Sequence, residues 1–338
     1  MATAQSASQI GFVQVESTYG TIPNSTGTAT VANADAFRLI SLETKAETGL
    51  IDRPSKTTVL GRTVGILGKK GGTWATTVEL AGSGAAGTAP DIDPFLQAAF
   101  GKAGTVSAGV SVTYGIEDAS PSLSIYNYRD PATMEHLVAL GAVVASTRFN
   151  LSQEQTSVEF SGPCRYVSPS EGFASLDATA KGGLTAFPTR PASPTYAGTM
   201  ALGLYGSATL DSNAYTTIRS LSISCDWARS LIDNTLFNGA YAGVPQQGIR
   251  SVTVEFELTD EDTTAIESLK SKARAKTAMD LVFVIGSTAG NIWTVTLNDT
   301  QLSSPDYNDG QPSWGVRFTG TAHATSETAK DEITIVCT

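Results

Sequence analysis

The sequence predicts a mainly β protein in which two similar β-rich lobes follow one another, each accompanied by one α-helix. Only 16% of the 338 residues are charged, and Gly, Ser, Thr and Ala are abundant, which is typical of an all-β chain with many turns. Many short stretches alternate between apolar and polar side chains, the period of a strand with one buried face. A strand that leads into a helix also occurs twice, which suggests duplicated lobes.

The first strand-to-helix unit lies between Trp74 and Gly101. From Trp74 to Leu80 every second side chain is suited to burial, which predicts a strand with one buried face. A glycine-rich loop follows. Asp93 is expected to cap a short helix, with Pro94 at its first position and Gly101 just past its end.

The second unit begins with a strand from Val252 to Leu258, where apolar residues again alternate with polar ones. Thr259 is expected to cap the helix that follows, and an apolar stripe on that helix comprises Ile266, Leu269 and Ala273. The basic residues of the segment 270–276 suit the C-terminal end of a helix, because cations complement the helix dipole there. We interpret them as a solvated helix end rather than as a DNA contact.

Composition divides the chain into four parts. Residues 1–36 carry few charged or large apolar side chains, so we expect an N-terminal arm ordered by a neighbouring molecule, or a disordered tail. Residues 37–167 are expected to form the first lobe, beginning with a long glycine-rich hairpin. Residues 168–195 contain four prolines and two adjacent glycines and read as a linker. Residues 196–338 are expected to form the second lobe.

Three short matches between the lobes occur in the same order. TVEL at 77–80 matches TVEF at 253–256, the apolar run 137–145 corresponds to 281–285, and VEFSG at 158–162 corresponds to VRFTG at 316–320.

Charge and cysteine usage exclude several functions. The net charge of -10 comes without a basic block, so the chain lacks the positive footprint of a protein that grips nucleic acid, although an acidic surface can guide DNA by repelling it. Three widely spaced cysteines and two histidines give no metal-binding pattern. No apolar run approaches the ~18 residues of a membrane span.

Catalytic and cofactor motifs are also lacking. Residues 82–87 fit GxGxxG, but Thr88-Ala89-Pro90 follows in place of a helix, so a dinucleotide site is not expected. No GxSxG nucleophile motif is present. We therefore predict no enzyme, and no catalytic, cofactor-binding or metal-binding residues. A β-rich carbohydrate-active protein remains an alternative, because the two acids of a glycosidase can be distant in sequence.

Four stretches carry a resemblance to a known family: ESTYGTIP at 16–23, VELAGSG at 78–84 with the helix that ends in AAFG, GAVVAS at 141–146, and GIRSVTVEF at 248–256. Together they resemble the tail tube (major tail) proteins of long-tailed, non-contractile bacteriophages, the siphophages. The resemblance extends over most of the chain.

The resemblance implies two tandem tail-tube-like β-sandwich or barrel lobes. Family members form rings whose inner sheets join into a barrel, and rings stack into a tube through long loops and terminal arms. Most members supply one lobe to a sixfold ring, so a duplicated chain implies either a trimer with pseudo-sixfold symmetry or a hexamer. The implied partners are the chain itself, the tape measure protein, the tail tip and terminator proteins, and phage DNA that passes without specific binding. The implied location is the virion, after assembly in the host cytoplasm.

The same resemblance suggests which residues line the lumen. Glu79, Glu159, Glu255 and Glu257 lie opposite the apolar faces of their strands, and an acidic, polar face lets DNA slide without sticking. The other interpretation is that these faces meet solvent on the outside. Rival functions are another tail component, such as a terminator or spike, and a carbohydrate-binding β-sandwich.

Overall fold

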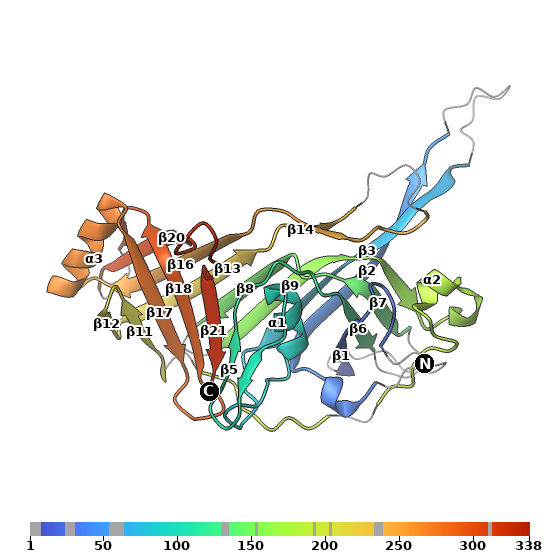
Figure 1. Ribbon diagram of the computed structural model, residues 1–338, viewed down its shortest axis with the longest axis horizontal. Helices are drawn as coiled ribbons and strands as arrows, with labels where there is room; N and C mark the ends of the chain where they lie inside the picture. The colour runs from blue at the N-terminus through green and yellow to red at the C-terminus, as the bar shows by residue number, and fades with distance from the viewer. Residues whose placement is uncertain are drawn as a thin grey trace.

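The computed structural model describes residues 8–23, 31–53, 64–129, 135–152, 155–191, 194–202, 205–232, 239–261, 263–309 and 313–338. The prediction of a mainly β protein is confirmed, because strands greatly outnumber helices in this part of the chain (Figure 1). Among the residues described, no helix has both the length and the apolar character needed to cross a membrane.

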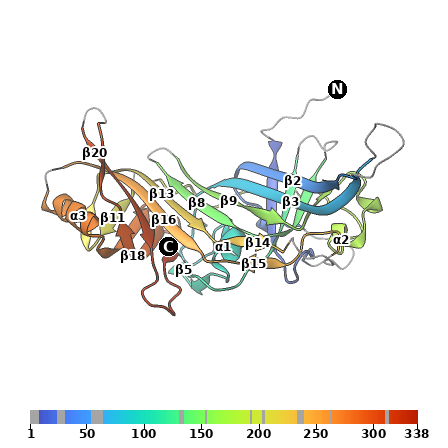
Figure 2. The same cartoon turned by 90° about the horizontal axis from the view of Figure 1, so that it is seen from above.

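One antiparallel sheet runs through the whole molecule, and we call it the long sheet (Figure 2). Its strands, in spatial order, are β2 (Leu39–Ile51), β3 (Ile66–Glu79), β9 (Thr156–Cys164), β8 (Ser146–Leu151), β13 (Ile218–Asp226), β16 (Ser251–Thr259), β20 (Gly315–Ala322) and β19 (Asp306–Asn308).

Two further sheets pack on one face of the long sheet and bury the core. The first consists of β1 (Ile10–Val15), β6 (Leu123–Tyr128), β7 (Leu137–Ala142) and β10 (Tyr166–Pro169). The second consists of β12 (Asn213–Tyr215), β11 (Ser207–Leu210), β17 (Ala278–Ile285), β18 (Trp293–Leu302), β21 (Ile333–Cys337), β5 (Ser111–Tyr114) and β4 (Thr105–Ser107). The end of β18 also pairs with β20, so this strand joins the two layers.

The strand order of the first half recurs in the second. The order β1-β6-β7-β10 is matched by β11-β17-β18-β21, and the order β2-β3-β9-β8 is matched by β13-β16-β20-β19. Each set follows the same sequence along the chain, with α1 (Asp93–Phe100) after β3 and α3 (Thr264–Ala275) after β16. Strands β4 and β5 are an exception: they come from the first half, but β5 pairs with β21 at the C-terminus and β4 pairs with β5.

A β-bulge fixes which residues of the two halves are equivalent. The pairing of β2 with β3 shifts between Leu39 and Ser41, and that of β13 with β16 shifts between Ile218 and Ser220. The next pairs, Ser41 with Thr77 and Ser220 with Glu257, are therefore equivalent. The following strand agrees, because Thr77 pairs with Glu159 and Glu257 pairs with Arg317.

This register corrects two of the correspondences expected from sequence. Thr77 is equivalent to Glu257, whereas the match of TVEL with TVEF had aligned it with Thr253, four residues earlier. The apolar pattern could not reveal this misalignment, because a shift by an even number of residues keeps every side chain on the same face of the strand. The run 137–145 contains β7, whose counterpart is β18 and not the 281–285 run in β17. Only the match between VEFSG and VRFTG agrees with the register.

Helix α1 packs into the core through Phe95, whose ring lies 5.1 Å from Phe160 and 5.8 Å from Trp74. The expected cap is wrong: Ile92 is the N-cap, while Asp93 is the first helical residue and accepts a hydrogen bond from the Tyr114 hydroxyl at 2.6 Å. Gly101 ends the helix with a left-handed φ of 86°, as predicted.

Helix α3 also begins at a different cap from the one expected. Thr263 is the N-cap and accepts a hydrogen bond from Ile266 N at 3.3 Å, while Thr259 still belongs to β16. The basic residues at its end are engaged within the molecule, since Lys270 contacts Asp260 at 2.7 Å. They do lie at the end of the helix, as expected, but Lys270 is buried and ion-paired rather than solvated.

The N-terminal segment is more than an arm. Its residues 1–7 and 24–30 lie outside the described part, but β1 pairs along its whole length with β6, and Phe12 and Val13 are buried. The apolar residues of β1 pack on both of its faces, with Val13 in the main core and Phe12 in a second apolar cluster, and the low overall hydrophobicity of residues 1–36 concealed this. Part of the expected linker, residues 168–195, is also packed: β10 pairs with β7, and Asp177 caps the short helix α2 (Ala178–Lys181).

Glu16 anchors the segment that follows β1. Its carboxylate accepts hydrogen bonds from Gly20 N, Ser122 Oγ and Ser124 Oγ, each at 2.7 Å, and from Gly141 N at 2.9 Å. Burial raises the pKa of this carboxyl, and the four donors oppose that effect. One side chain thus joins β1, β6 and β7.

Asp91 is a second buried acid, just before α1. It accepts a hydrogen bond from Arg38 N at 3.1 Å and lies 3.6 Å from Arg38 Nε. Burial is the largest effect and raises the pKa of Asp91 from 3.8 to about 6, while Arg38 acts in the opposite direction. Between about pH 4 and pH 6 the carboxyl of Asp91 therefore stays protonated in the folded protein but is ionised in the unfolded chain.

Replacing Glu16 by alanine should destabilise the fold by about 3 kcal/mol, because four donors in the interior would lose their acceptor. Glu16→Gln should cost less, since it keeps one acceptor oxygen. Urea unfolding followed by tryptophan fluorescence measures both. Glu43→Ala, at an exposed site on β2, is the control and should change the stability by at most about 0.5 kcal/mol. Equal effects at the two sites would contradict the role of Glu16.

The Asp91 pKa predicts a pH dependence. Because the folded pKa lies above the unfolded one, the contribution of Asp91 to stability should fall as the pH rises from about 4 to about 6 and stay constant above, by on the order of 3 kcal/mol in all. The difference in unfolding free energy between Asp91→Asn and wild type, measured from pH 4 to pH 7, should follow this curve. A difference that does not vary with pH would contradict it.

Candidate functional site

One face of the long sheet is polar across its whole width, and we call it the polar face. It lies opposite the face that packs on the core, and alternate residues of each strand point to it. Small hydroxyl side chains dominate it, namely Ser41, Thr77, Ser146, Ser157, Ser161, Ser222, Ser224, Thr253, Thr319 and Thr321.

The structure brings the four glutamates singled out from the sequence onto the polar face. Glu79 lies on β3, Glu159 on β9, and Glu255 and Glu257 on β16. Glu159 is exposed, and the others are half-buried. They come from three strands and share a face because each alternates with buried residues.

Arginines from neighbouring strands lie beside three of these carboxylates. Arg317 contacts Glu255, and Arg219 NH1 lies 3.4 Å from Glu257 Oε1. Arg148 is directly opposite Glu159 in the pairing of β8 with β9. Sequence analysis missed these arginines. Arg148 and Arg317 alternate with buried residues along β8 and β20, whereas Arg219 lies at the bulge of β13, where the alternation is broken.

Hydrogen bonds extend this arrangement across the middle of the long sheet. Asn150 Nδ2 donates to Glu159 Oε1 at 2.9 Å, and Arg148 Nε donates to Ser222 Oγ at 3.1 Å. The second bond crosses from β8 to β13 and so links the two halves of the chain. The charged groups are therefore held in place by neighbours.

Acidic residues outnumber basic ones on the polar face. Glu43, Asp226 and Asp306 join the four glutamates, whereas the cations are Lys45, Arg148, Arg219 and Arg317, with Lys276 beside one of the hollows. Two shallow hollows open on this face, and serine and threonine are the most frequent residues in their linings. Among the described residues, no cluster of three or more His, Cys, Asp or Glu could hold a metal ion. The chemistry of the face is that of a hydrated, weakly acidic surface.

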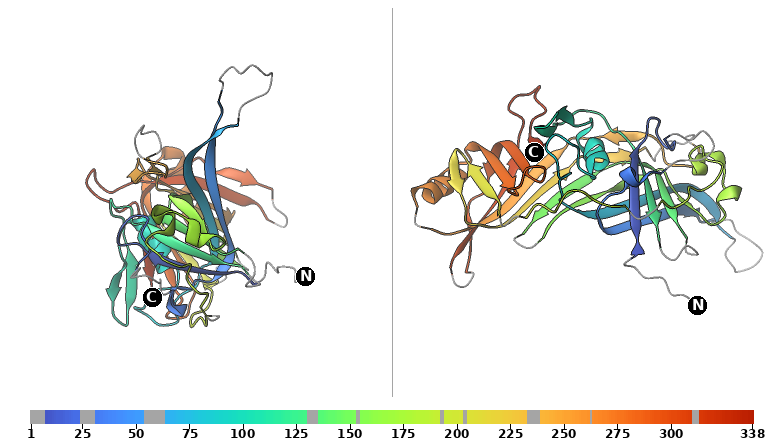
Figure 3. Two further views of the ribbon diagram at one scale, coloured as in Figure 1. Left: turned by 90° about the vertical axis from the view of Figure 1, so that its right-hand side faces the viewer. Right: turned by 90° about the horizontal axis from the view of Figure 1, so that it is seen from below.

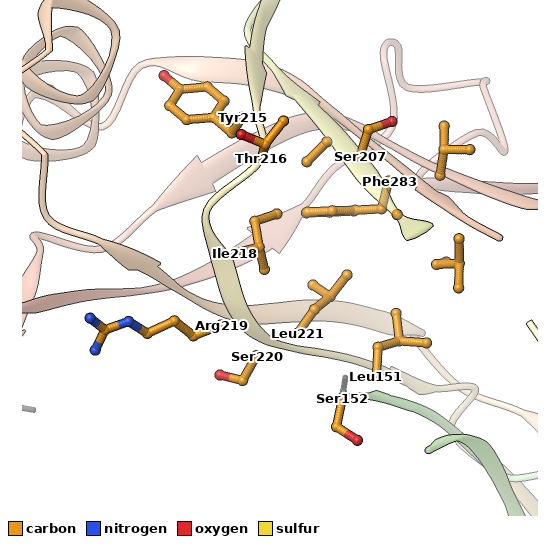
Figure 4. Close-up of a pocket in the computed structure, with 14 residues that line it drawn as sticks. Leu151, Ser152, Ser207, Tyr215, Thr216, Ile218, Arg219, Ser220, Leu221 and Phe283 are labelled. Atoms are coloured by element: carbon orange, nitrogen blue, oxygen red, sulfur yellow. The ribbon is translucent and has the colours of Figure 1, made fainter. Parts of the chain in front are cut away.

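A small apolar pocket of about 160 Å³ lies between β11, β13 and β17 (Figure 4). Phe283, Leu221 and Ile218 line it, and the guanidinium of Arg219 points away from it. The residues that line this pocket include no acid, so it lacks the pair of carboxyl groups that hydrolysis of a glycosidic bond needs.

The glycine-rich loop at residues 82–87 packs against another loop of the chain. Gly84 N donates to Gly290 O at 3.0 Å, and a Cβ on Gly82 would come within 2.0 Å of the same oxygen. Gly84 also has a left-handed φ of 81°. Close backbone approach therefore explains these glycines, and helix α1 begins too far along the chain to cradle a phosphate.

Comparison with known proteins identifies the family. The model of the family described as "Phage tail tube protein" matches residues 5–322. A solved chain titled "Virion of native gene transfer agent (GTA) particle" is 14% identical, with 36% of this chain and 92% of that chain covered and a TM-score of 0.28. No curated protein sequence matches. Because the family model spans nearly the whole sequence, the chain belongs to the phage tail tube protein family and is a structural protein of the virion tail.

Proposed function

We propose that three copies of the chain close into a ring with pseudo-sixfold symmetry and that stacked rings form the tail tube. The observation that carries this proposal is the junction between β8 and β13. In the spatial order of the long sheet, β8 is the strand at the inner end of the first half and β13 is the strand at the inner end of the second half. The two pair over six residue pairs. A single chain thus already contains one copy of the contact that ring closure requires.

The same contact can be made between copies. The long sheet ends at β2 and β19, which are the counterparts of β13 and β8. Pairing β19 of one copy with β2 of the next would repeat the β8–β13 junction and leave no open edge on the ring. Both halves contribute equally to the long sheet, so three copies supply as many units as six single-lobe subunits would.

The repeated register specifies which residues meet at this boundary. Within the chain, Arg148 pairs with Ser224. Arg148 pairs with Glu159 and Asp306 pairs with Arg317; since Glu159 and Arg317 are equivalent, Asp306 is the counterpart of Arg148. Lys45 is likewise the counterpart of Ser224. Asp306 of one copy therefore faces Lys45 of the next, which places opposite charges across the boundary.

The division into lobes follows from the same repetition. We assign residues 37–167 to the first lobe and 196–338 to the second, with an arm at 1–36 and a linker at 168–195. The recurring strand order supports two lobes. The pairing of β1 with β6 joins part of the arm to the first lobe, and the pairing of β5 with β21 ties the two lobes together.

In the ring we place the polar face toward the lumen, with Glu79, Glu159, Glu255 and Glu257 among the residues that line it. The opposite face is already covered by the two outer sheets, so the polar face is the one left to bound a channel. Its excess of carboxylates repels DNA, and its serines and threonines keep it hydrated. Phage DNA would pass through without specific binding during ejection.

The remaining partners follow from this position in the tail. The tape measure protein would occupy the lumen before ejection, and the terminator and tail tip proteins would cap the two ends of the tube. A non-contractile tail of the siphophage type is the setting that the resemblance of the sequence supports.

Disulfide cross-linking through cysteines placed at the proposed boundary should reveal the number of copies in a ring. Lys45→Cys/Asp306→Cys should form disulfides between copies, because opposed residues of an antiparallel pair lie within disulfide range. On a non-reducing gel the ladder of cross-linked species should end at three copies. The native cysteines at 164, 225 and 337 are buried, and each single variant serves as a control. A ladder that ends at six, or no cross-link within tubes seen by electron microscopy, would contradict the proposal.

A charge change on the lumen wall should make the tube retain DNA. Tubes of Glu79→Lys/Glu159→Lys should hold a fluorescent oligonucleotide at low salt and protect it from nuclease, whereas wild-type tubes should not. Glu171→Lys/Glu327→Lys, at exposed sites outside the long sheet, is the matched control. Any DNA bound by the control should be digested. If the first variant gives no protected DNA, these glutamates do not line the lumen.

A further inference from the structure

The far end of the β2–β3 hairpin exposes four aliphatic side chains. Leu50 is 70% exposed, Leu67 69%, Ile51 58% and Ile66 55%. The hairpin projects from the body of the molecule (Figure 3). Exposed apolar patches of this kind are characteristic of interaction sites, because covering them removes apolar surface from water.

The second half contains the counterpart of this hairpin end. It is the ribbon formed by β14 (Arg229–Leu231) and β15 (Pro245–Gln247), which continues β13 and β16. Counted from the shared bulge, the pair of Leu50 with Leu67 is equivalent to the pair of Arg229 with Gln247. In both hairpins the pairing register of the two strands also shifts by one residue just before these pairs.

The β14–β15 ribbon lies against the first half of its own chain. Arg229 is 3% exposed and donates to Ala98 O near the end of α1, to Val144 O at 3.4 Å and to Ala119 O at 2.9 Å. Trp227 N donates to Ala145 O at 2.9 Å. The ribbon is therefore seated where α1 ends beside the connection between β7 and β8.

An equivalent corner exists in the second half. The hydrogen bond from Ala145 N to Ser161 O, 2.8 Å, recurs as the bond from Ser303 N to Thr319 O, 2.6 Å, at matching positions of the register. Helix α3 ends there at Lys276, in the same left-handed conformation as Gly101. One of the shallow hollows opens at this corner, with Lys276, Gln301, Ser303 and Gly320 among its lining residues.

We propose that the β2–β3 hairpin of one copy docks on this corner of the adjacent copy in the same ring. The inference rests on the proposed ring, in which β2 continues the β19 edge as β13 continues the β8 edge. Leu50 then takes the position that Arg229 has within the chain. A cation is not needed there, because Lys276 Nζ already donates to Leu302 O at 3.1 Å, the counterpart of Val144 O.

The contact has a defined chemistry. The aliphatic stem of Lys276 and the small residues at 303 and 320 offer a shallow seat for leucine and isoleucine side chains. The hairpin therefore reaches around the ring and links copies sideways. An axial role, in which the hairpin joins one ring to the next, is the competing arrangement that the experiments must separate.

Leu50→Ser/Leu67→Ser tests the contact. Both sites are exposed, so the variant should keep the circular dichroism spectrum and melting temperature of wild type. It should remain monomeric at concentrations at which wild type forms rings and tubes in negative-stain images. Val106→Ser/Val110→Ser, at sites 57% and 59% exposed, is the matched control and should assemble normally. Complete rings that fail to stack would assign the hairpin to axial contacts and overturn the proposal, as would normal tubes.

A cross-link separates this inference from the ring itself. Leu50→Cys/Lys276→Cys should give a disulfide-linked ladder between copies, and neither single variant should. If Lys45→Cys/Asp306→Cys forms a ladder but Leu50→Cys/Lys276→Cys does not, the ring stands and the docking site is wrong. If wild-type protein forms no rings under any condition, the proposed function fails first.

Discussion

The antiparallel pairing of β8 with β13 is the constraint on which the rest of the structure depends. Strand edges carry unpaired backbone donors and acceptors, which must be paired wherever the edge is buried and which favour pairing with another strand wherever it is exposed. This pairing merges the sheets of the two halves into one long sheet and fixes their relative register. The polar face, the order of the outer sheets and the position of the β14–β15 ribbon all follow from that register.

Because of the duplication, each kind of contact has two counterparts in the chain. One is made within the chain, and the other lacks its partner in the part of the chain that the structure describes. One sheet edge is paired within the chain, and its counterparts remain at β2 and β19. One hairpin end is seated through Arg229, and its counterpart exposes Leu50. A tail tube protein must bind copies of itself repeatedly, and in the proposed ring the contacts made inside the chain serve as templates for those between copies.

Sequence patterns gave the strands and their faces but not their partners. Alternation placed the four glutamates opposite the core because side-chain direction depends only on parity along a strand. The same parity hid a four-residue error in the alignment of β3 with β16, which only the bulge and the ladder reveal. The role of Glu16 was inaccessible for a different reason, since its donors come from positions more than a hundred residues away as well as from Gly20.

As the lumen wall of the proposed ring, the polar face would meet two opposing electrostatic requirements. A wall with many unpaired carboxylates would repel DNA strongly, but the same charges would repel one another across a closed ring and oppose assembly. Pairing Glu255 with Arg317 and Glu257 with Arg219 lowers that repulsion while leaving an excess of acid. Hydroxyl side chains fill the remaining positions, and each of them binds water without adding charge. An inert conduit therefore needs few charges, held by neighbours and separated by serine and threonine, which is the pattern that the long sheet presents.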